Sequence, residues 1–128
     1  MKRAMRGVVA GLLVAALTAG AAQAATGAMP VAVFLAKADA LKAKGLGALG
    51  SPDIGLLKAE GQAAGQAYRA RLQAERAAGK PSSCPPKGAK VNSRQLIAHL
   101  RSYPEAARAR TDMRTAMADF FIKTYPCK

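Results

Sequence analysis

The sequence has no tryptophan and only three tyrosines and three phenylalanines among its 128 residues. Aromatic and β-branched residues are enriched in β-strands. This chain is instead rich in alanine, the best helix former. The scarcity of aromatic residues therefore argues against a β-sandwich and predicts an all-α domain.

Side chains that carry out acid–base chemistry or bind metal ions are also scarce. The chain has one histidine, His99, together with two cysteines and seven acidic residues. A nucleophilic site needs a serine or cysteine beside a base with an orienting acid, and structural zinc takes four ligands. His99 falls among apolar residues, which predicts a position at the edge of the core. We therefore expect no enzyme activity, no metal site and no cofactor.

The first 24 residues have the pattern of a secretory signal peptide. Lys2, Arg3 and Arg6 precede an uncharged apolar run over residues 7–17, and Ala22-Gln23-Ala24 supplies a small-x-small cleavage site. The apolar run is shorter than the roughly 20 residues that a membrane span needs. We expect cleavage before Ala25, export to the periplasm, no stable membrane insertion, and one mature domain over residues 25–128.

Positive charge dominates this mature domain. Without the three basic residues of the leader, 17 basic residues face 7 acidic ones, a net charge of +10. Such an excess often indicates nucleic-acid binding. Export and the scattered placement of the basic residues along helices argue against nucleic acid. Most of them are expected on a solvated face, with contact to an acidic protein or an anionic envelope surface as the alternative.

The only two cysteines, Cys84 and Cys127, each lie beside a proline at the border of a predicted helix. In an oxidising compartment they could form a disulfide that clamps a helical hairpin. The bond would close a loop of 44 residues, which stabilises the fold by about 4 kcal/mol in the chain-entropy model.

Hydrophobic periodicity and capping residues predict four helices. They cover residues 30–44, 51–78, 92–103 and 111–124, and residues 105–110 form a loop or a frayed turn. Residues 45–50 match the dinucleotide-binding pattern G-x-G-x-x-G, but no strand precedes them, so a flexible connector is the better interpretation. The prediction is a small domain of four mostly antiparallel helices clamped by one disulfide.

Two glycines interrupt the inner face of the second predicted helix. Gly61 and Gly65 lie four residues apart, with Tyr68 on the same face. Glycine inside a helix costs about 0.5–1 kcal/mol relative to alanine, so both positions need a reason. We expect close packing of another helix against Gly61, Gly65 and Tyr68, and a groove for a ligand is the alternative.

The motifs of the C-terminal half resemble the Rap/Tai family. They are Cys84-Pro85-Pro86 with Gly88, Ser93-Arg94-Gln95-Leu96, Tyr103-Pro104-Glu105 and Tyr125-Pro126-Cys127. Members of this family are small exported helical proteins that act as immunity proteins against type VI secretion effectors, notably peptidoglycan amidases. The resemblance covers about residues 61–127. It implies a helical fold, the Cys84–Cys127 bond, and a non-catalytic protein that binds and inhibits an amidase effector in the periplasm.

An immunity role predicts a surface that plugs the substrate groove of the effector. The candidate is a protruding loop over residues 105–110, and the basic side chains offered to an acidic rim would be Arg101, Arg108, Arg110 and Arg114. A solvated basic loop is the alternative. Two other functions stay open, a periplasmic chaperone and a structural envelope protein, and so does association into a homodimer.

Overall fold

Five α-helices and one 3-10 helix form the part of the chain that the computed structural model describes, residues 25–128. The predicted signal peptide, residues 1–24, lies outside the described residues. The elements follow in the order α1 (Val31–Lys44), η1 (Gly45–Gly50), α2 (Pro52–Ala77), α3 (Ser93–Arg101), α4 (Glu105–Arg108) and α5 (Met113–Thr124). Residues 25–128 contain no strand, so the predicted all-α fold is confirmed. None of these helices is long and apolar enough to cross a membrane.

Local sequence determines where α2 and α3 begin. The Ser51 hydroxyl accepts the backbone N–H of Asp53 at 3.2 Å, directly before a proline in the first turn. At α3, Asn92 and Gln95 form a reciprocal capping box with bonds of 2.8 and 3.0 Å. Side chains at these positions satisfy backbone N–H groups that have no partner within the helix. Both predicted starts are confirmed.

The start of α5 differs from the prediction by one residue. The predicted range begins at residue 111, but the N-cap is Asp112, whose carboxylate accepts the Thr115 N–H at 2.8 Å. The Thr111 hydroxyl instead donates to the carbonyl of Ala107 at 2.8 Å, at the end of α4.

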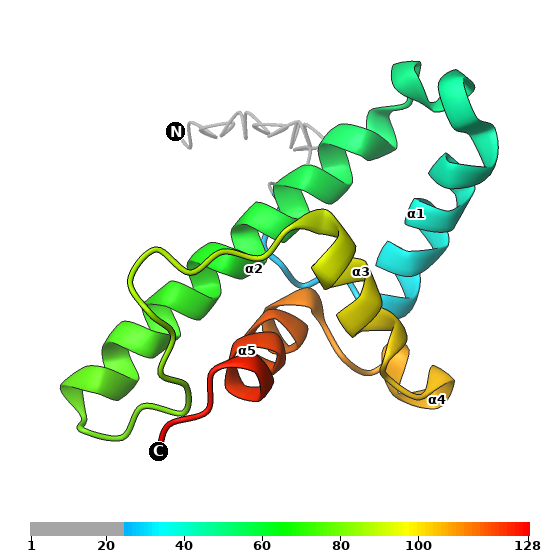
Figure 1. The fold of residues 1–128 in the computed structure, drawn as a ribbon. Helices are drawn as coiled ribbons and strands as arrows, with labels where there is room; N and C mark the ends of the chain where they lie inside the picture. Colours follow the sequence, from blue (N-terminus) through cyan, green and yellow to red (C-terminus); the bar gives the residue numbers. More distant parts are fainter. Residues whose placement is uncertain (1–24) are drawn as a thin grey trace, which may run out of the picture.

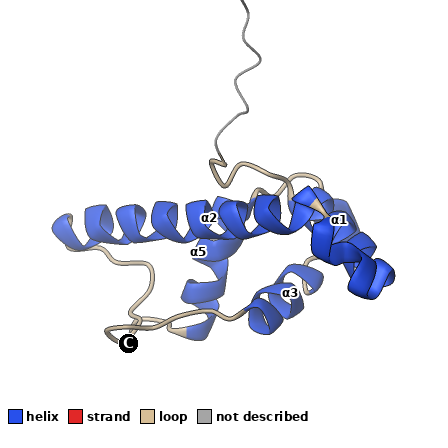
Figure 2. Ribbon diagram, turned by 90° about the horizontal axis from the view of Figure 1, so that it is seen from above, coloured by secondary structure: helices blue, strands red, loops and turns tan. Residues whose placement is uncertain are grey.

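The helices are arranged around α2, the longest of them. Figure 1 shows α1 and α2 as a helical hairpin joined by η1. The most extensive contact is between α2 and α5, and the two views show α5 crossing α2 steeply instead of running beside it (Figures 1 and 2). The expected mostly antiparallel arrangement is therefore wrong for the main contact of the core.

The core lies where α1, α3 and α5 meet α2. Tyr68 of α2 stacks on Phe121 of α5, with ring centroids 4.2 Å apart and planes 9° from parallel. The other large buried side chains are Val31, Phe34, Leu35, Leu72, Leu96, Leu100, Met113, Met117 and Phe120. The methionines and phenylalanines of α5 therefore belong to the core. Ile54, in the first turn of α2, is 41% exposed and lies outside the core.

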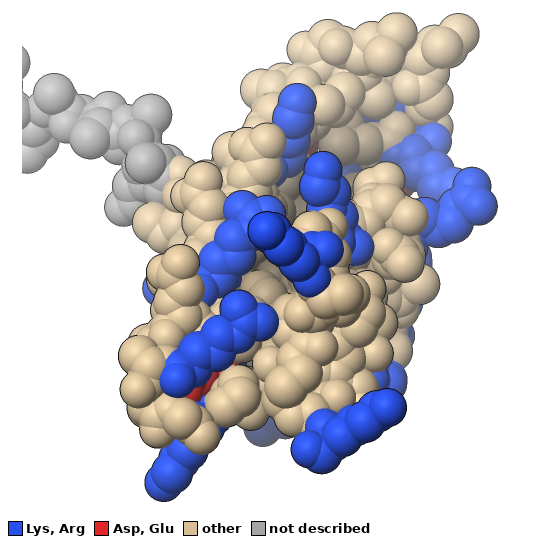
Figure 3. All heavy atoms as spheres, turned by 60° about the vertical axis from the view of Figure 1, so that its left-hand side comes forward, with Lys and Arg blue, Asp and Glu red and all other residues tan. Residues whose placement is uncertain are grey.

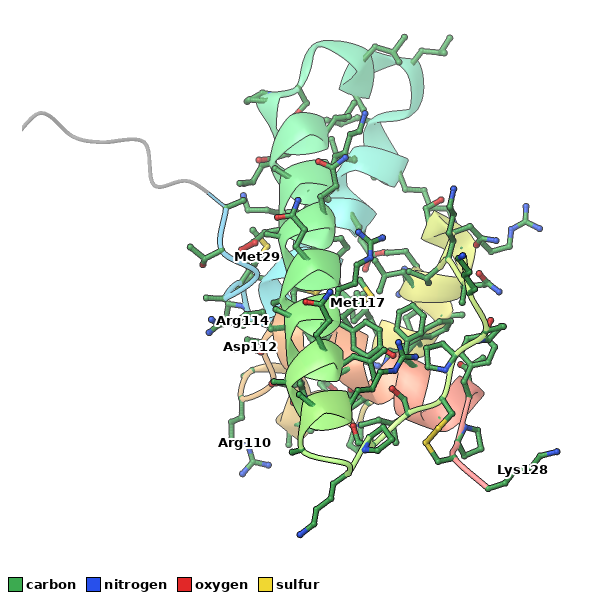
Figure 4. All side chains as sticks on the ribbon, turned by 90° about the vertical axis from the view of Figure 1, so that its left-hand side faces the viewer. Met29, Arg110, Asp112, Arg114, Met117 and Lys128 are labelled. Carbon is green, nitrogen blue, oxygen red and sulfur yellow. A yellow bond between two sulfur atoms is a disulfide. The ribbon has the colours of Figure 1, made fainter. Side chains whose placement is uncertain are left out.

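A buried carboxylate holds the segment before α1 against α2. Glu60 is 5% exposed, and its two oxygens accept the backbone N–H groups of Gly27 at 2.6 Å and Met29 at 3.1 Å. The same segment bonds to the start of α5, where Met113 donates to the Met29 carbonyl at 2.9 Å. Met29, Asp112 and Arg114 accordingly lie together on one side of α2 (Figure 4).

The predicted disulfide between Cys84 and Cys127 is present. The Cys84 N–H also donates to the carbonyl of Tyr125 at 2.8 Å. These two bonds fasten the long loop between α2 and α3 to the end of the chain after α5.

Candidate functional site

A groove runs along α2 and is closed on its other side by the loop before α3. It has a volume of about 1340 Å³ and is lined on α2 by residues from Leu57 to Arg76 and on the loop by residues 85–92. In Figure 4 the labelled side chain of Met117 lies in the space between α2 and this loop. We call this feature the α2 groove.

The floor of the α2 groove is the apolar core itself. Its lining includes the stacked rings of Tyr68 and Phe121, with Met117 beside them. Floor residues also come from α1 and α3, namely Phe34 and Leu96. These floor side chains are at most 8% exposed. The apolar surface that a ligand would remove from water therefore belongs mainly to the partly buried residues of the lining, namely Leu57, Val91 and Ile97.

The charged residues that line the α2 groove are all basic. They are Lys58, Arg69 and Arg76 on α2, and Lys87 and Lys90 on the loop. Figure 3 shows Lys and Arg side chains standing over this face, with acidic atoms visible in only one small place. Two facing rows of positive charge above an apolar floor favour a ligand that is both acidic and partly apolar.

Gly61 and Gly65 line the α2 groove instead of packing against a helix. A Cβ atom built on either glycine would have no atom within 4 Å outside its own helix turn. The prediction of close helix packing at these glycines is therefore wrong, because α5 crosses α2 elsewhere and leaves this stretch open. The third member of the predicted set, Tyr68, does pack in the core.

Three sets of bonds hold the loop wall of the α2 groove. At its start the Cys84–Cys127 disulfide fastens the chain, and the buried Ser83 hydroxyl bonds to the Tyr68 hydroxyl at 2.7 Å. At its end the capping box of Asn92 joins the loop to α3. The wall is thus tied to α2, to α3 and to the C-terminal segment without a helix or strand of its own.

The arginines predicted to bind a partner do not surround the α2 groove. Arg101 forms an ion pair with Asp39 of α1. Arg108 donates to the backbone carbonyls of Tyr103 at 3.0 Å and Arg101 at 2.8 Å, so its guanidinium satisfies the C-terminal end of α3. The segment 105–110 is therefore bonded to α3 through Arg108.

The other two predicted arginines lie on the opposite side of α2. Arg114 contacts Asp112 at 3.3 Å, and the exposed Arg110 points away from the body of the protein (Figure 4). The four arginines do not form one continuous patch, and their role in partner binding stays a prediction.

A polar cluster joins α3 to α5 around His99. The His99 Nε2 atom lies 2.9 Å from the carbonyl of Ala116, and the Tyr103 hydroxyl donates to Asp119. The fold brings Asp119 of α5 to this cluster through the Tyr103 hydroxyl, which also lies 3.3 Å from His99 Nε2. Burial lowers the pKa of His99 below its usual value, and hydrogen bonding to Ala116 offsets part of this effect.

The hydroxyl of Tyr103 is held in its protonated form. Burial raises the pKa of Tyr103 well above its usual value, and the bond to Asp119 adds to the shift. The bonds of His99 to Ala116 and of Tyr103 to Asp119 connect α3 and the residues after it to α5. Among residues 25–128, no group of three or more His, Cys, Asp or Glu side chains could hold a metal ion.

The hairpin tip carries a second exposed feature. The connector over residues 45–50 was expected to be flexible but forms the 3-10 helix η1, in which Leu46 is 86% exposed and Leu49 is 77% exposed. In Figure 1 this tip is the end of the hairpin farthest from α5. No described residue covers these leucines.

Sequence reasoning missed the buried Glu60, and it gave a groove at Gly61, Gly65 and Tyr68 only as the alternative to helix packing; these three residues line the α2 groove. A pattern did indicate Glu60, since it lies three residues after Leu57 and four before Ala64, on the same helix face. Most loop residues of the groove wall carry no such pattern. Comparison of the chain with protein-family models, with curated proteins and with solved structures finds no match.

Proposed function

We propose that this chain is an exported, non-catalytic binding protein whose partner docks in the α2 groove. The observation that carries the proposal is an open groove with an apolar floor and only basic charges among its lining side chains. A protein partner fits this combination because protein interfaces join an apolar centre to a complementary charged rim.

The partner class that we propose comes from the resemblance to the Rap/Tai family. The protein would bind a type VI secretion amidase effector in the periplasm and block its action on peptidoglycan. The solvent-exposed disulfide supports a location outside the cytosol, because such bonds persist in oxidising compartments. Inhibition by binding needs no catalytic group on this chain.

Inhibition of an amidase tests the proposal directly. The mature protein, residues 25–128, is added in increasing amounts to type VI amidase effectors encoded in the same genome, and peptidoglycan hydrolysis is measured. We expect stoichiometric inhibition of one effector. If every effector stays fully active and calorimetry detects no complex, the immunity function is contradicted.

Two charge-reversal variants decide which surface binds. Lys87→Glu with Lys90→Glu changes the groove rim, and Arg108→Glu with Arg110→Glu changes the segment first predicted to plug the effector. We expect the rim variant to weaken inhibition by at least tenfold. A larger loss in the arginine variant would move the binding surface to residues 105–110. Suppression of the aggregation of unrelated proteins, without inhibition, would favour the chaperone alternative.

A further inference from the structure

We propose that the occupant of the α2 groove is a single amphipathic α-helix of a partner protein, with acidic flanks and an apolar face. This inference rests on the proposed binding function and names the partner element that the groove recognises.

The dimensions of the α2 groove suit a helix that is half sunk into it. Its lining on α2 extends from Leu57 to Arg76, which corresponds to about 29 Å at 1.5 Å per residue. A ligand helix of about 19 residues would match this length. Because the groove is open on one side, such a helix would bury one face and leave the other in solvent.

The backbone chemistry of the walls favours a helix over an extended segment. One wall is α2, whose backbone groups are bonded within the helix, and the other begins with Pro85 and Pro86, which have no N–H to donate. An extended peptide would find no backbone partner along α2 and could pair only with the loop wall, where the N–H groups of Lys87, Gly88 and Lys90 have no partner among residues 25–128. A helix satisfies those groups internally.

The charges of the walls select the acidic partner. Arg69 and Arg76 on α2 face a loop that carries Lys87 and Lys90. A helix lying between these walls would place its two flanks against positive charge, so glutamate and aspartate on both flanks are favoured. A second copy of this strongly basic chain is disfavoured by the same charges. A bilayer is too flat to reach the recessed floor at Met117.

The two glycines mark the place of closest approach. Gly61 and Gly65 occur one turn apart in the α2 wall, where a side chain would project into open space. Without side chains, this part of the wall can meet an incoming helix at backbone distance. A bulky residue here would fill the volume that the ligand helix needs and would leave the fold of the free protein unchanged.

Fluorescence anisotropy with a designed peptide tests the inference. The probe is a labelled 20-residue helix with leucine on one face and glutamate elsewhere; a lysine version and a scrambled version of the glutamate peptide serve as comparisons. We expect the glutamate helix to bind at least tenfold more tightly than either comparison. Equal binding of the helical and scrambled glutamate peptides would contradict the inference that the occupant is an amphipathic helix.

Matched variants locate the binding. Gly65→Leu blocks the groove, and its control is Gly55→Leu, a substitution in the same helix at a glycine outside the groove with equally open surroundings. Arg69→Glu with Arg76→Glu reverses the rim, and Arg94→Glu with Lys128→Glu makes the same change of net charge elsewhere. We expect at least a tenfold loss of probe binding in each groove variant and less than a twofold change in each control. Equal losses of probe binding in the groove variants and their controls would contradict binding in the α2 groove.

The same variants separate this inference from the proposed function. If an effector is inhibited equally by wild type, Gly65→Leu and the reversed rim, the binding function stands and the helix-in-groove inference falls. If the peptide binds as expected but no effector does, the immunity function falls and the docking chemistry stands. Vesicles of phosphatidylglycerol serve as a further competitor. Displacement of the probe by vesicles, together with vesicle binding that Gly65→Leu abolishes, would assign the groove to lipid and overturn the inference.

Discussion

The carboxylate of Glu60, buried in the first half of α2, accepts the backbone N–H of Gly27 at 2.6 Å, across 33 residues of sequence. Its other oxygen accepts the N–H of Met29. One side chain thus satisfies two backbone donors of the segment that leads into α1, and it holds this segment between α2 and the start of α5. An acidic residue on an apolar helix face is explained by these two bonds.

Removal of the Glu60 carboxylate should loosen the N-terminal segment. Because Glu60→Ala leaves two backbone N–H groups without their acceptor, we expect a loss of about 2 kcal/mol or more in the free energy of unfolding. Hydrogen exchange should accelerate at Gly27 and Met29 before it does in α5. The control is Glu105→Ala at an exposed acid, which should change stability by no more than about 0.5 kcal/mol. Equal effects of the two substitutions would contradict the role of Glu60.

Alanine substitutions at two glycines should have opposite effects. Gly27 has a φ of +77°, and a Cβ atom there would lie 2.6 Å from Cγ of Arg114 and 3.1 Å from the backbone of Ala64. We expect Gly27→Ala to destabilise the protein by about 1–3 kcal/mol. Gly61 is helical with open space around it, so Gly61→Ala should stabilise by about 0.5–1 kcal/mol. Urea denaturation measures both. Destabilisation by Gly61→Ala would mean that this glycine has a packing role after all.

Reduction of the disulfide should lower stability and free one wall of the α2 groove. The Cys84–Cys127 bond joins residues 43 apart in sequence. Loss of this link costs about 4 kcal/mol in the chain-entropy model, which corresponds to a fall of roughly 15 °C or more in Tm. Calorimetry with and without reductant measures the change, and amide exchange over residues 85–92 should increase in parallel. A variant with Ser at both positions should not respond to reductant. An unchanged melting curve of the wild type would refute this prediction.

The stability of the fold should fall on acidification in two steps. The folded pKa of His99 lies below its usual value of 6.5 because of burial, and the cationic Lys123 lowers it further, whereas the Ala116 carbonyl and Asp119 oppose the shift. The unfolded chain therefore takes up this proton first, so stability is complete above about pH 7 and decreases below about pH 6.5. His99→Gln keeps a donor for the Ala116 carbonyl and should remove this step. Urea midpoints between pH 5 and 8 measure it. An identical pH profile in the variant would contradict the assignment to His99.

The second step should come from Asp112 at lower pH. Burial acts to raise the pKa of Asp112, but its bonds with Thr115 and Arg114 outweigh this and lower the pKa below its usual value of 3.8. The stabilisation from this carboxylate is present above about pH 4 and is lost as the pH falls through the folded pKa. Asp112→Asn retains a cap for α5 and should reduce the loss below pH 4 without altering the step near pH 6. Circular dichroism melts of the wild type and Asp112→Asn at pH 3 and pH 5 measure the difference in acid sensitivity.

The beginnings of the helices could be predicted because they depend on neighbours in sequence. Asn92 and Gln95 cap α3 over a distance of three residues, and Ser51 caps α2 in the same way. A cap of this kind needs no tertiary contact, so a linear pattern is sufficient to find it. The disulfide could also be predicted from the sequence, since the chain has only two cysteines.

The sequence left a groove along α2 as an alternative to close helix packing and could not choose between them, because the choice depends on the angle at which α5 crosses α2. The same glycine pattern at Gly61 and Gly65 suits a close helix contact and an open wall equally well, and only the placement of α5 decides between them. Glu60 is a similar case, since its two acceptor bonds require the segment around Gly27 to return over α2. The sequence by itself determined the helical character of the chain, its helix starts and its pair of cysteines through short-range chemistry. The tertiary structure decided which apolar faces were covered, because packing joins residues whose distance along the chain no local pattern encodes.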